Sequence, residues 1–318
     1  MTQPSNRPPE SAASEAPAPD FTGPDFTGNE ASGSDRRREV GNVLKTFYDT
    51  YGWTIDAAAG THYHHSYFQD MHDSAVRYRY DHELRFKRYY DGGGRYFLDA
   101  GCGGEPRPKL AVDFQRHVCV DISIMGLKEA RNQLGDSGDY VLADLTALPF
   151  KDQSFDGVLA SHCLYHVEKD SQVNVLRDMY RTTKANKTIL VFYSSRYNLV
   201  SLLHRIPILT LPLINGLLHR MGLLLTTNPP YVRRYKKGAK TFEDSVPALY
   251  SFAHNPMKLA REFSSVRVTC LMSLSNYDTQ LLRRLRLLGI VLIGLDFLEK
   301  KFPKAMRYFG KYVCIRIV

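Results

Sequence analysis

The chain has 318 residues and a mass of 36.3 kDa, with 43% hydrophobic and 24% charged residues. These values exclude a collagen-like repeat, wholesale disorder and a multi-span membrane protein. The net charge of +9 is unevenly spread: residues 1–35 carry −5, residues 36–195 carry zero and residues 196–318 carry +14. Such asymmetry bears on the partners of a protein rather than on its fold. Five widely spaced cysteines without a CxxC pair favour a reducing, cytoplasmic compartment.

Residues 1–35 are predicted to form a disordered tail. They are rich in Pro, Ser, Gly, Ala and acidic residues, and they contain a tandem PDFTG repeat at 19–23 and 24–28. They offer too little apolar surface to offset the conformational entropy lost on ordering. We therefore expect one folded domain over residues 36–318.

Residues 36–94 are predicted to form an N-terminal helical lid. The pattern over 39–90 is mostly helical and dense in aromatic residues. The run HYHH at 62–65, with His72 and His82, suggests a metal site, but it lacks the fixed spacing of HExxH. We expect instead a helix that closes over the ligand, with one or two rings facing the pocket and no metal.

Short apolar runs then alternate with helix-length segments, which is typical of βαβ units and a parallel sheet. Two further strands are expected near the C-terminus, separated by a basic helical stretch. The pattern predicts an α/β, doubly wound, seven-stranded Rossmann-like sheet with helical lid and cap insertions. The predicted strands are Tyr96–Ala100, His117–Val120, Tyr140–Ala143, Gly157–Ala160, Thr188–Tyr193, Val266–Leu271 and Tyr312–Val318.

Carboxylates lie at the ends of three of these strands, where open α/β sheets bind ligands. Asp99 precedes a glycine-rich turn that allows a ligand to approach the backbone closely, and it is placed to accept hydrogen bonds from a cationic group. Asp121 ends the second strand, and its two oxygens suit the two hydroxyls of a ribose. Asp144 follows the third strand and could accept from an adenine amine.

With these motifs, residues 96–193 resemble the class I S-adenosylmethionine-dependent methyltransferases, and they are similar to the small-molecule branch that includes the quinone-biosynthesis enzymes. LDAGCGG resembles the family's nucleotide loop, VCVDIS its ribose motif, and ADLTALPF its adenine motif, while FDGVLASHCLYHV resembles its fourth strand and following loop. Several motifs in order are far more specific than any one of them. The resemblance implies a cofactor-binding core at 95–195 and S-adenosyl-L-methionine as cofactor. The cofactor residues it implies are Asp99, Ala100, Gly101, Cys102, Gly103, Asp121, Ile122, Asp144, Leu145 and Ser161.

The chain departs from the family pattern at two places. Glu105 stands where the family has its third glycine, which we expect to reshape the loop. Asn186 lies in a turn that usually carries glycine, and asparagine tolerates the left-handed backbone required there. A hydride-transferring dinucleotide enzyme is the alternative, but its GxGxxG turn needs glycine where Pro106 stands.

The loop after the fourth strand carries the candidate catalytic residues, His162, Tyr165 and His166. A histidine near its ordinary pKa can take a proton from a hydroxyl as a methyl group moves. His166 is the first candidate for this general base. Many members of the family work mainly by proximity, because the sulfonium of the donor is already activated.

Residues 196–254 are predicted to form a helical cap insertion over the substrate pocket. Its longest uncharged run, 206–218, has 13 residues and is too short to cross a bilayer. The sequence NPPY at 228–231 matches a motif of amino-methyltransferases, but it lies about 70 residues beyond the position that this motif occupies in them. We interpret it as a coincidence.

Basic residues gather at 233–240 and at 281–311, the latter within the C-terminal part of the sheet at 255–318. Lysine and arginine beside apolar residues favour an anionic membrane surface, and an ordinary solvated face explains the same pattern equally well. Nucleic acid is disfavoured because these stretches lack interleaved stacking aromatics.

The predicted function is methyl transfer to an oxygen, carbon or nitrogen of a small, hydrophobic or lipid-linked acceptor by a cytoplasmic enzyme that sits peripherally on the membrane. A soluble enzyme that methylates a sugar or secondary metabolite is the first alternative. An RNA or protein methyltransferase that docks through the basic C-terminal portion is the second. A scaffold that has lost activity is the third. The sequence predicts no oligomeric state.

Overall fold

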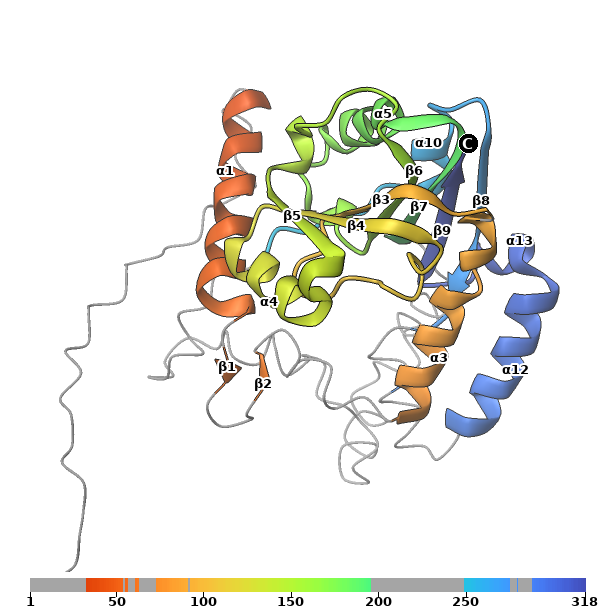
Figure 1. Cartoon of the computed structure of the whole chain (residues 1–318). Coiled ribbons are helices and arrows are strands. Elements are labelled where there is room, and N and C mark those ends of the chain that lie inside the picture. The colour runs from red at the N-terminus through yellow and green to blue at the C-terminus, as the bar shows by residue number, and fades with distance from the viewer. Residues whose placement is uncertain are drawn as a thin grey trace, which may run out of the picture.

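The computed structural model describes residues 33–53, 55–56, 61–62, 73–90, 92–195, 249–274, 279 and 288–318. Most of the predicted tail and cap, the His-rich run 63–72, the NPPY motif and the basic residues at 233–240 and 283–286 lie outside these ranges. The described chain is built around one central sheet (Figure 1).

The large sheet has seven strands in the order β5-β4-β3-β6-β7-β9-β8. The first five pair in parallel, and β9 runs antiparallel to both β7 and β8. All seven predicted strands are present, and the α/β Rossmann-like prediction is confirmed. The strands are β3 Gly94–Ala100, β4 Phe114–Asp121, β5 Gly138–Leu142, β6 Phe155–Ser161, β7 Thr183–Ser194, β8 Val266–Met272 and β9 Tyr312–Ile317.

Successive strand side chains point to opposite faces, so the sheet separates two cores. On one face, Leu98 and buried residues of the adjacent strands, such as Val118 and Val158, pack with α5 (Gln172–Thr182) and α10 (Pro256–Ala260). On the other face, Phe97 packs in a core that includes side chains of α3 (Asp73–Leu84) and α12 (Leu288–Lys301). Strands buried on both faces explain the nearly continuous apolar runs of the sequence.

The N-terminal region departs from its prediction in two ways. Helix α1 (Gly33–Phe47) begins inside the predicted tail, where Asp35 in its first turn complements the helix dipole. The π-helix η1 (Tyr48–Gly52) continues it. The prediction of a mostly helical 39–90 is wrong at β1 (Ile55–Asp56) and β2 (Thr61–His62), which pair antiparallel. β-Branched residues in both strands favour this extended backbone.

The remaining helices connect the strands and follow the expected order. Helix α4 starts after Ser123, whose hydroxyl accepts from the Gly126 amide at 3.0 Å, and Asn255 caps α10 in the same way. Asn186 has φ +62°, the left-handed backbone that the sequence predicted. The elements not yet given are α4 Ile124–Leu134, α13 Pro303–Met306, η2 Lys87–Tyr90, η3 Gly135–Ser137, η4 Leu145–Ala147 and η5 Leu164–His166.

The described end of the predicted cap, residues 249–254, is irregular rather than helical. Its polar groups bond to the core instead of to each other. The Phe252 amide donates to the Tyr165 carbonyl at 2.7 Å, and the His254 amide donates to the Tyr193 hydroxyl at 2.8 Å. These bonds to separate core elements replace the local bonds of a helix, so the helical prediction is wrong here.

A buried polar cluster attaches α12 to the fold. The carboxylate of Glu299, which is fully buried, accepts from the Tyr78 hydroxyl at 2.6 Å and from the Ser273 amide at 2.7 Å. His82 Nε2 lies 2.6 Å from the other carboxylate oxygen. Helices α3 and α12 and the end of β8 therefore share one hydrogen-bonded centre.

Replacing Glu299 with alanine should lower the free energy of unfolding by about 3 kcal/mol, because three buried polar groups lose their partner at once. Urea unfolding of the Glu299→Ala variant checks this. The matched control is Lys300→Ala on the same helix, which removes an exposed pair with Asp296 and should cost at most about 1 kcal/mol. Equal losses in the two variants would contradict the anchoring role.

Candidate active site

A cavity of about 510 Å³ lies at the carboxyl ends of β3, β4 and β6. This is an ordinary volume for a small-molecule site. Helix α1 and η1 supply one wall, and η5 and the start of β9 supply others. All three candidate catalytic residues line it, as do nine of the ten predicted cofactor residues. The exception is Ala100, which is fully buried and whose carbonyl accepts from Cys163 Sγ at 3.1 Å.

The glycine-rich turn after β3 brings bare backbone to the cavity. Gly101 has φ +69° and Gly103 has φ +52°, both in the left-handed region. A Cβ on Gly103 would lie 2.5 Å from Cζ2 of Trp53, which packs over the turn. Trp53 is the only tryptophan of the chain, and sequence analysis did not identify it as a site residue. Nothing in the sequence near it pointed to this contact.

Asp121 holds the turn from the neighbouring strand. One carboxylate oxygen accepts from the Gly103 amide and the other from the Ser123 amide, both at 2.8 Å. Burial raises the pKa of Asp121 to about 6, and the nearby Asp49 charge adds to this. The carboxylate is thus ionised at neutral pH but becomes protonated in mildly acidic solution.

Asp99 at the end of β3 has one engaged oxygen and one unengaged oxygen. Oδ2 accepts from the Arg107 amide at 2.9 Å and lies 3.2 Å from His117 Nε2. Burial alone would lower the pKa of His117, but the hydrogen bonds and charges of Asp99 and Cys119 together outweigh it and raise that pKa to about 9. Oδ1 is buried with no hydrogen-bond partner among the described residues. A buried acceptor that lacks a donor is suited to a cationic ligand group.

The far end of the cavity has the features expected for a purine. Asp144 accepts from the Thr146 amide at 2.8 Å, and Ile122 and Leu145 line the cavity beside it. Helix α1 crosses here, because a Cβ on Gly41 would lie 3.5 Å from Asp144 Oδ2. The predicted lid therefore contacts this end of the cavity through α1, whereas Tyr78 and Phe86 of the aromatic stretch belong to the core.

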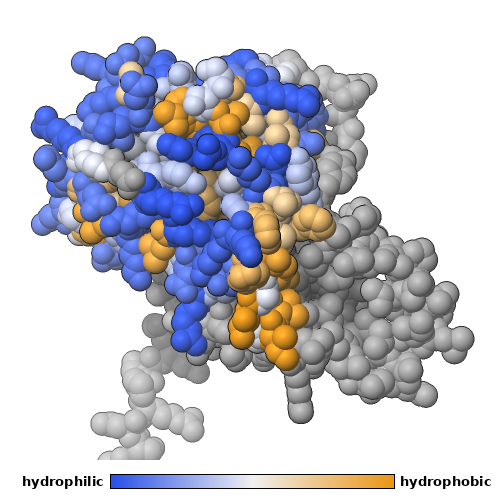
Figure 2. Space-filling view, turned by 90° about the vertical axis from the view of Figure 1, so that its right-hand side faces the viewer, coloured by the Kyte–Doolittle hydropathy of each residue, from blue (hydrophilic) through white to orange (hydrophobic). Residues whose placement is uncertain are grey.

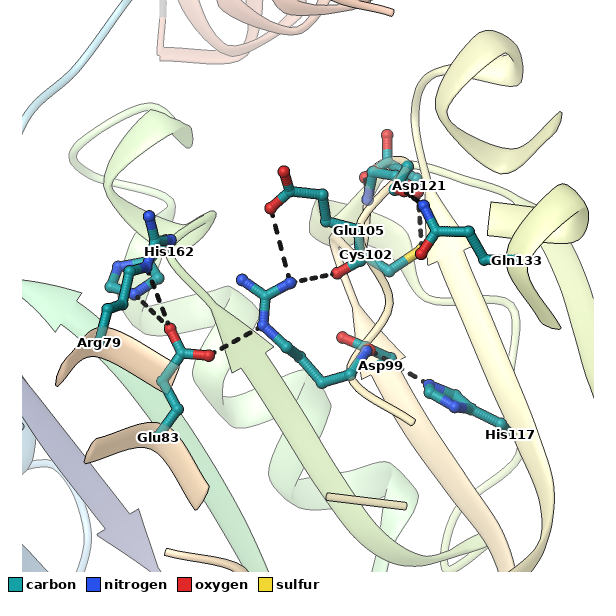
Figure 3. A network of polar contacts seen from close by, with 12 residues as sticks. Arg79, Glu83, Asp99, Cys102, Glu105, His117, Asp121, Gln133 and His162 are labelled. Carbon is teal, nitrogen blue, oxygen red and sulfur yellow. Dashed lines mark hydrogen bonds and ion pairs between the residues drawn. The ribbon is translucent and has the colours of Figure 1, made fainter. Parts of the chain in front are cut away.

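Charged side chains from three elements meet at the opposite end (Figure 3). Glu83 of α3 accepts from Arg107 Nε at 3.0 Å and lies 3.4 Å from both Arg79 Nε and His162 Nε2. Burial would raise the pKa of Glu83, but Arg107, His162 and Arg79 together outweigh it and hold that pKa well below its usual range. Glu105 joins this group, with Oε2 3.6 Å from Arg107 Nη1. The departure from the family's third glycine thus supplies a partner for Arg107.

The three catalytic candidates differ in their surroundings. His166 Nδ1 donates to the Tyr250 carbonyl at 2.8 Å, and burial lowers its pKa to about 4. Burial also lowers the pKa of His162, which has Glu83 as its carboxylate partner. Burial raises the pKa of Tyr165 well above its ordinary value, so its phenol stays protonated. Both histidines are neutral at pH 7.

The described residues contain no group of three or more His, Cys, Asp and Glu side chains that could hold a metal ion. Of the histidines that suggested such a site, His82 pairs with Glu299 in the buried polar cluster that attaches α12 to the fold. Within the same ranges, no helix is long and apolar enough to cross a membrane.

Comparison with known proteins identifies the core. Residues 98–191 match the family model described as a methyltransferase domain. The matched region is a methyltransferase domain. The β-strand order and the carboxylates at the strand ends agree with this assignment, which the sequence motifs had predicted.

Two curated relatives show the branch to which this methyltransferase domain is similar. The ubiquinone/menaquinone biosynthesis C-methyltransferase UbiE of Vibrio parahaemolyticus is 36% identical over 113 residues, which cover 32% of this chain and 42% of that protein. The demethylmenaquinone methyltransferase of Renibacterium salmoninarum is 33% identical over 102 residues, which cover 31% and 40%. The chain therefore spans about two fifths of the length of the curated relatives it matches.

A solved structure extends the likeness in fold beyond this core. Phosphoethanolamine N-methyltransferase 1 of Haemonchus contortus is 12% identical, with a TM-score of 0.51 over 88% of this chain and 49% of that chain. Identity this low supports the fold alone.

Placing alanine at Gly103 should displace Trp53 and weaken the fold. The new Cβ meets the indole at 2.5 Å, and the left-handed backbone adds roughly 1 kcal/mol, so the free energy of unfolding should fall by at least about 2 kcal/mol. Tryptophan emission should also shift, and urea unfolding followed by fluorescence measures both effects. The control is Gly289→Ala on α12, where a Cβ meets open space. In this variant the free energy of unfolding should not fall and the tryptophan emission should not shift. An unchanged emission in Gly103→Ala would contradict the packing described.

Proposed function

We propose that this protein binds S-adenosyl-L-methionine and transfers its methyl group to a small hydrophobic acceptor. The observation that carries the proposal is the convergence of three carboxylates, Asp99, Asp121 and Asp144, on one cavity of a methyltransferase domain. They lie at the carboxyl ends of β3 and β4 and just after β5, and each suits a different part of the same ligand.

Along the cavity, each of the three carboxylates suits a different chemical group of S-adenosyl-L-methionine. The unpartnered Oδ1 of Asp99 suits the ammonium of the methionine end. Asp121 keeps lone pairs for the ribose hydroxyls while it holds the two backbone amides. Asp144 would accept from the adenine amine between Ile122 and Leu145. Bound in this way, the sulfonium would lie near the glycine turn, where Gly101 and Gly103 leave room.

The donor supplies an activated methyl group, so the reaction is one in-line displacement. The acceptor atom gives an electron pair to the methyl carbon, the carbon–sulfur bond breaks, and the sulfur keeps that electron pair. The chain's residues align donor and acceptor and exclude water. A proton on the acceptor must leave, and this is the step where a general base acts.

The lining beyond the cofactor residues supports a hydrophobic acceptor. Leu44 and Phe47 of the α1 wall, Leu249, Met272 and Tyr312 all line the cavity. The matched relatives are named as methyltransferases of ubiquinone and menaquinone biosynthesis. We therefore propose a quinone-type precursor with a carbon nucleophile as the first acceptor to test, in a cytoplasmic setting that suits the five unpaired cysteines.

We propose His162, ahead of His166, as the general base. Glu83 lies 3.4 Å from His162 and would stabilise the imidazolium formed when the ring takes a proton. Among the described residues, the hydrogen-bond partner of His166 is a backbone carbonyl, and a pKa of about 4 makes it a weak base. This proposal differs from the sequence-based prediction, which placed His166 first.

Calorimetric titration should show S-adenosylmethionine binding that depends on the ionised Asp121. Because burial places the pKa of Asp121 near 6, the carboxylate is charged at pH 7.5 and mostly protonated at pH 5. Affinity should therefore fall about tenfold between these pH values, as protonation removes acceptor lone pairs. The Asp121→Asn variant should bind at least about tenfold more weakly at pH 7.5 and lose this pH dependence.

The matched control is Asp139→Asn, an exposed residue of β5 paired with Arg116, which should bind like wild type. A folded wild type that binds no S-adenosylmethionine would refute the proposed cofactor. Binding of the cofactor without methylation of quinone precursors by labelled donor would refute the acceptor alone.

With an acceptor in hand, His162→Asn should lower kcat by about a hundredfold or more, whereas His166→Asn should lower it less than tenfold. Asparagine suits position 162 because it tolerates the positive φ of +58° found there. Single-turnover rates across pH measure the effect, and calorimetry confirms that both variants still bind the donor. The assignment fails if His166→Asn is the slower variant.

A further inference from the structure

The outer side of α12 and the segment after it expose an unusual concentration of apolar side chains (Figure 2). Of the 12 large hydrophobic residues exposed in the described ranges, seven lie between 290 and 309, and the other five are spread over distant elements. We call these seven residues the α12 surface. They are Ile290, Ile293, Phe297, Leu298, Phe302, Tyr308 and Phe309.

Helix α12 is apolar on both of its sides. On its inner side, Leu292 packs in the core and Glu299 belongs to the buried polar cluster with Tyr78 and Ser273. These contacts fix the orientation of α12 on the fold. On the outer side, Ile290 and Ile293 are each 75% exposed and Phe297 is 57% exposed. A helix that is hydrophobic all round is normally buried on all sides. The outer side of α12 is therefore built for an apolar environment outside the described fold.

Positive charge borders the same surface. Residues 290–309 contain four lysines and arginines, at positions 300, 301, 304 and 307, against two acidic residues, Asp296 and Glu299. Glu299 is fully buried beside His82, and Asp296 pairs with Lys300 at 2.8 Å. Lys301 Nζ lies 5.2 Å from the Phe297 ring centre and 5.6 Å from that of Phe302, so charge and apolar rings form one continuous patch.

We infer that the α12 surface docks the protein onto an anionic lipid bilayer. Exposed isoleucine and phenylalanine beside clustered lysine and arginine are typical of helices that lie in the membrane interface, and tyrosine is enriched at the same depth. At 14 residues, α12 is about 21 Å long, shorter than the ~30 Å hydrocarbon core, so it would lie along the interface. Anionic headgroups would neutralise the lysines while the acyl boundary takes up the apolar side chains.

This inference goes beyond methyl transfer and does not depend on it. The α12 surface is also close in sequence to the cavity, because Lys311 and Tyr312, which line the cavity, follow Phe309 by two and three residues. Docking through the α12 surface would hold this wall of the cavity beside the bilayer, where hydrophobic acceptors are concentrated.

Sedimentation of the full chain with phosphatidylcholine vesicles, with and without phosphatidylglycerol, tests the inference. Wild type should bind the anionic vesicles at low salt, and this binding should weaken as the salt concentration is raised. Both Ile293→Ser/Phe297→Ser and Lys301→Glu/Lys304→Glu should reduce the partition coefficient at least about tenfold. The matched controls are Leu142→Ser and Lys128→Glu, exposed residues of other elements, which should bind like wild type.

Three results would overturn the inference. The first is that wild type stays in solution with anionic vesicles at low salt. The second is that the variants of the α12 surface bind the vesicles as tightly as wild type. The third is a dimer in lipid-free solution that the Ile293→Ser/Phe297→Ser change dissociates, because a second copy would then cover the surface. Calorimetry of the same variants with S-adenosylmethionine reports the proposed cofactor separately, so failure of one proposal is distinguishable from failure of the other.

Discussion

The ion pair between Glu83 and Arg107 is the interaction on which the geometry of the candidate site depends. The Arg107 amide bonds to Asp99 at the end of β3, while its guanidinium reaches Glu83 on α3. Glu83 in turn faces His162, which follows β6. One buried pair thus joins the N-terminal region, the glycine loop and the loop after the fourth strand. Burial of such charges is tolerated because each has several partners, and removing one would leave the others uncompensated.

The sequence was sufficient to locate the sheet and the carboxylates at its edge. Strands buried on both faces leave apolar runs that need no tertiary information to detect, and parallel strands bring their carboxyl ends to one edge. Asp99, Asp121 and Asp144 could therefore be assigned to one site before any contact was known. The start of α1, which lies in the predicted tail, and the β1–β2 pair were missed because their signals are short and weak.

The polar partners behind the site could not be predicted in the same way. Glu83 lies 24 residues before Arg107, and His117 lies 18 residues after Asp99, so each pair forms only when separate elements pack. Trp53 reaches the glycine turn at Gly103 from outside the motif-bearing core, from a position 50 residues earlier in the chain. Glu105 was the nearest signal, because an acid in place of glycine needs a cation nearby, yet its sequence position does not say which cation.

The backbone of His162 has a consequence for the residues that can occupy this position. Among the described residues, only Gln153, His162 and Asn186 combine a side chain with a positive φ, and of these only His162 lines the cavity. Its amide is bound to the Phe192 carbonyl at 3.0 Å, which fixes the conformation. Glycine and asparagine would fit this backbone with little strain, whereas valine and isoleucine would not. Sequence variation at position 162 is therefore restricted by local chain geometry as well as by the chemistry of the cavity.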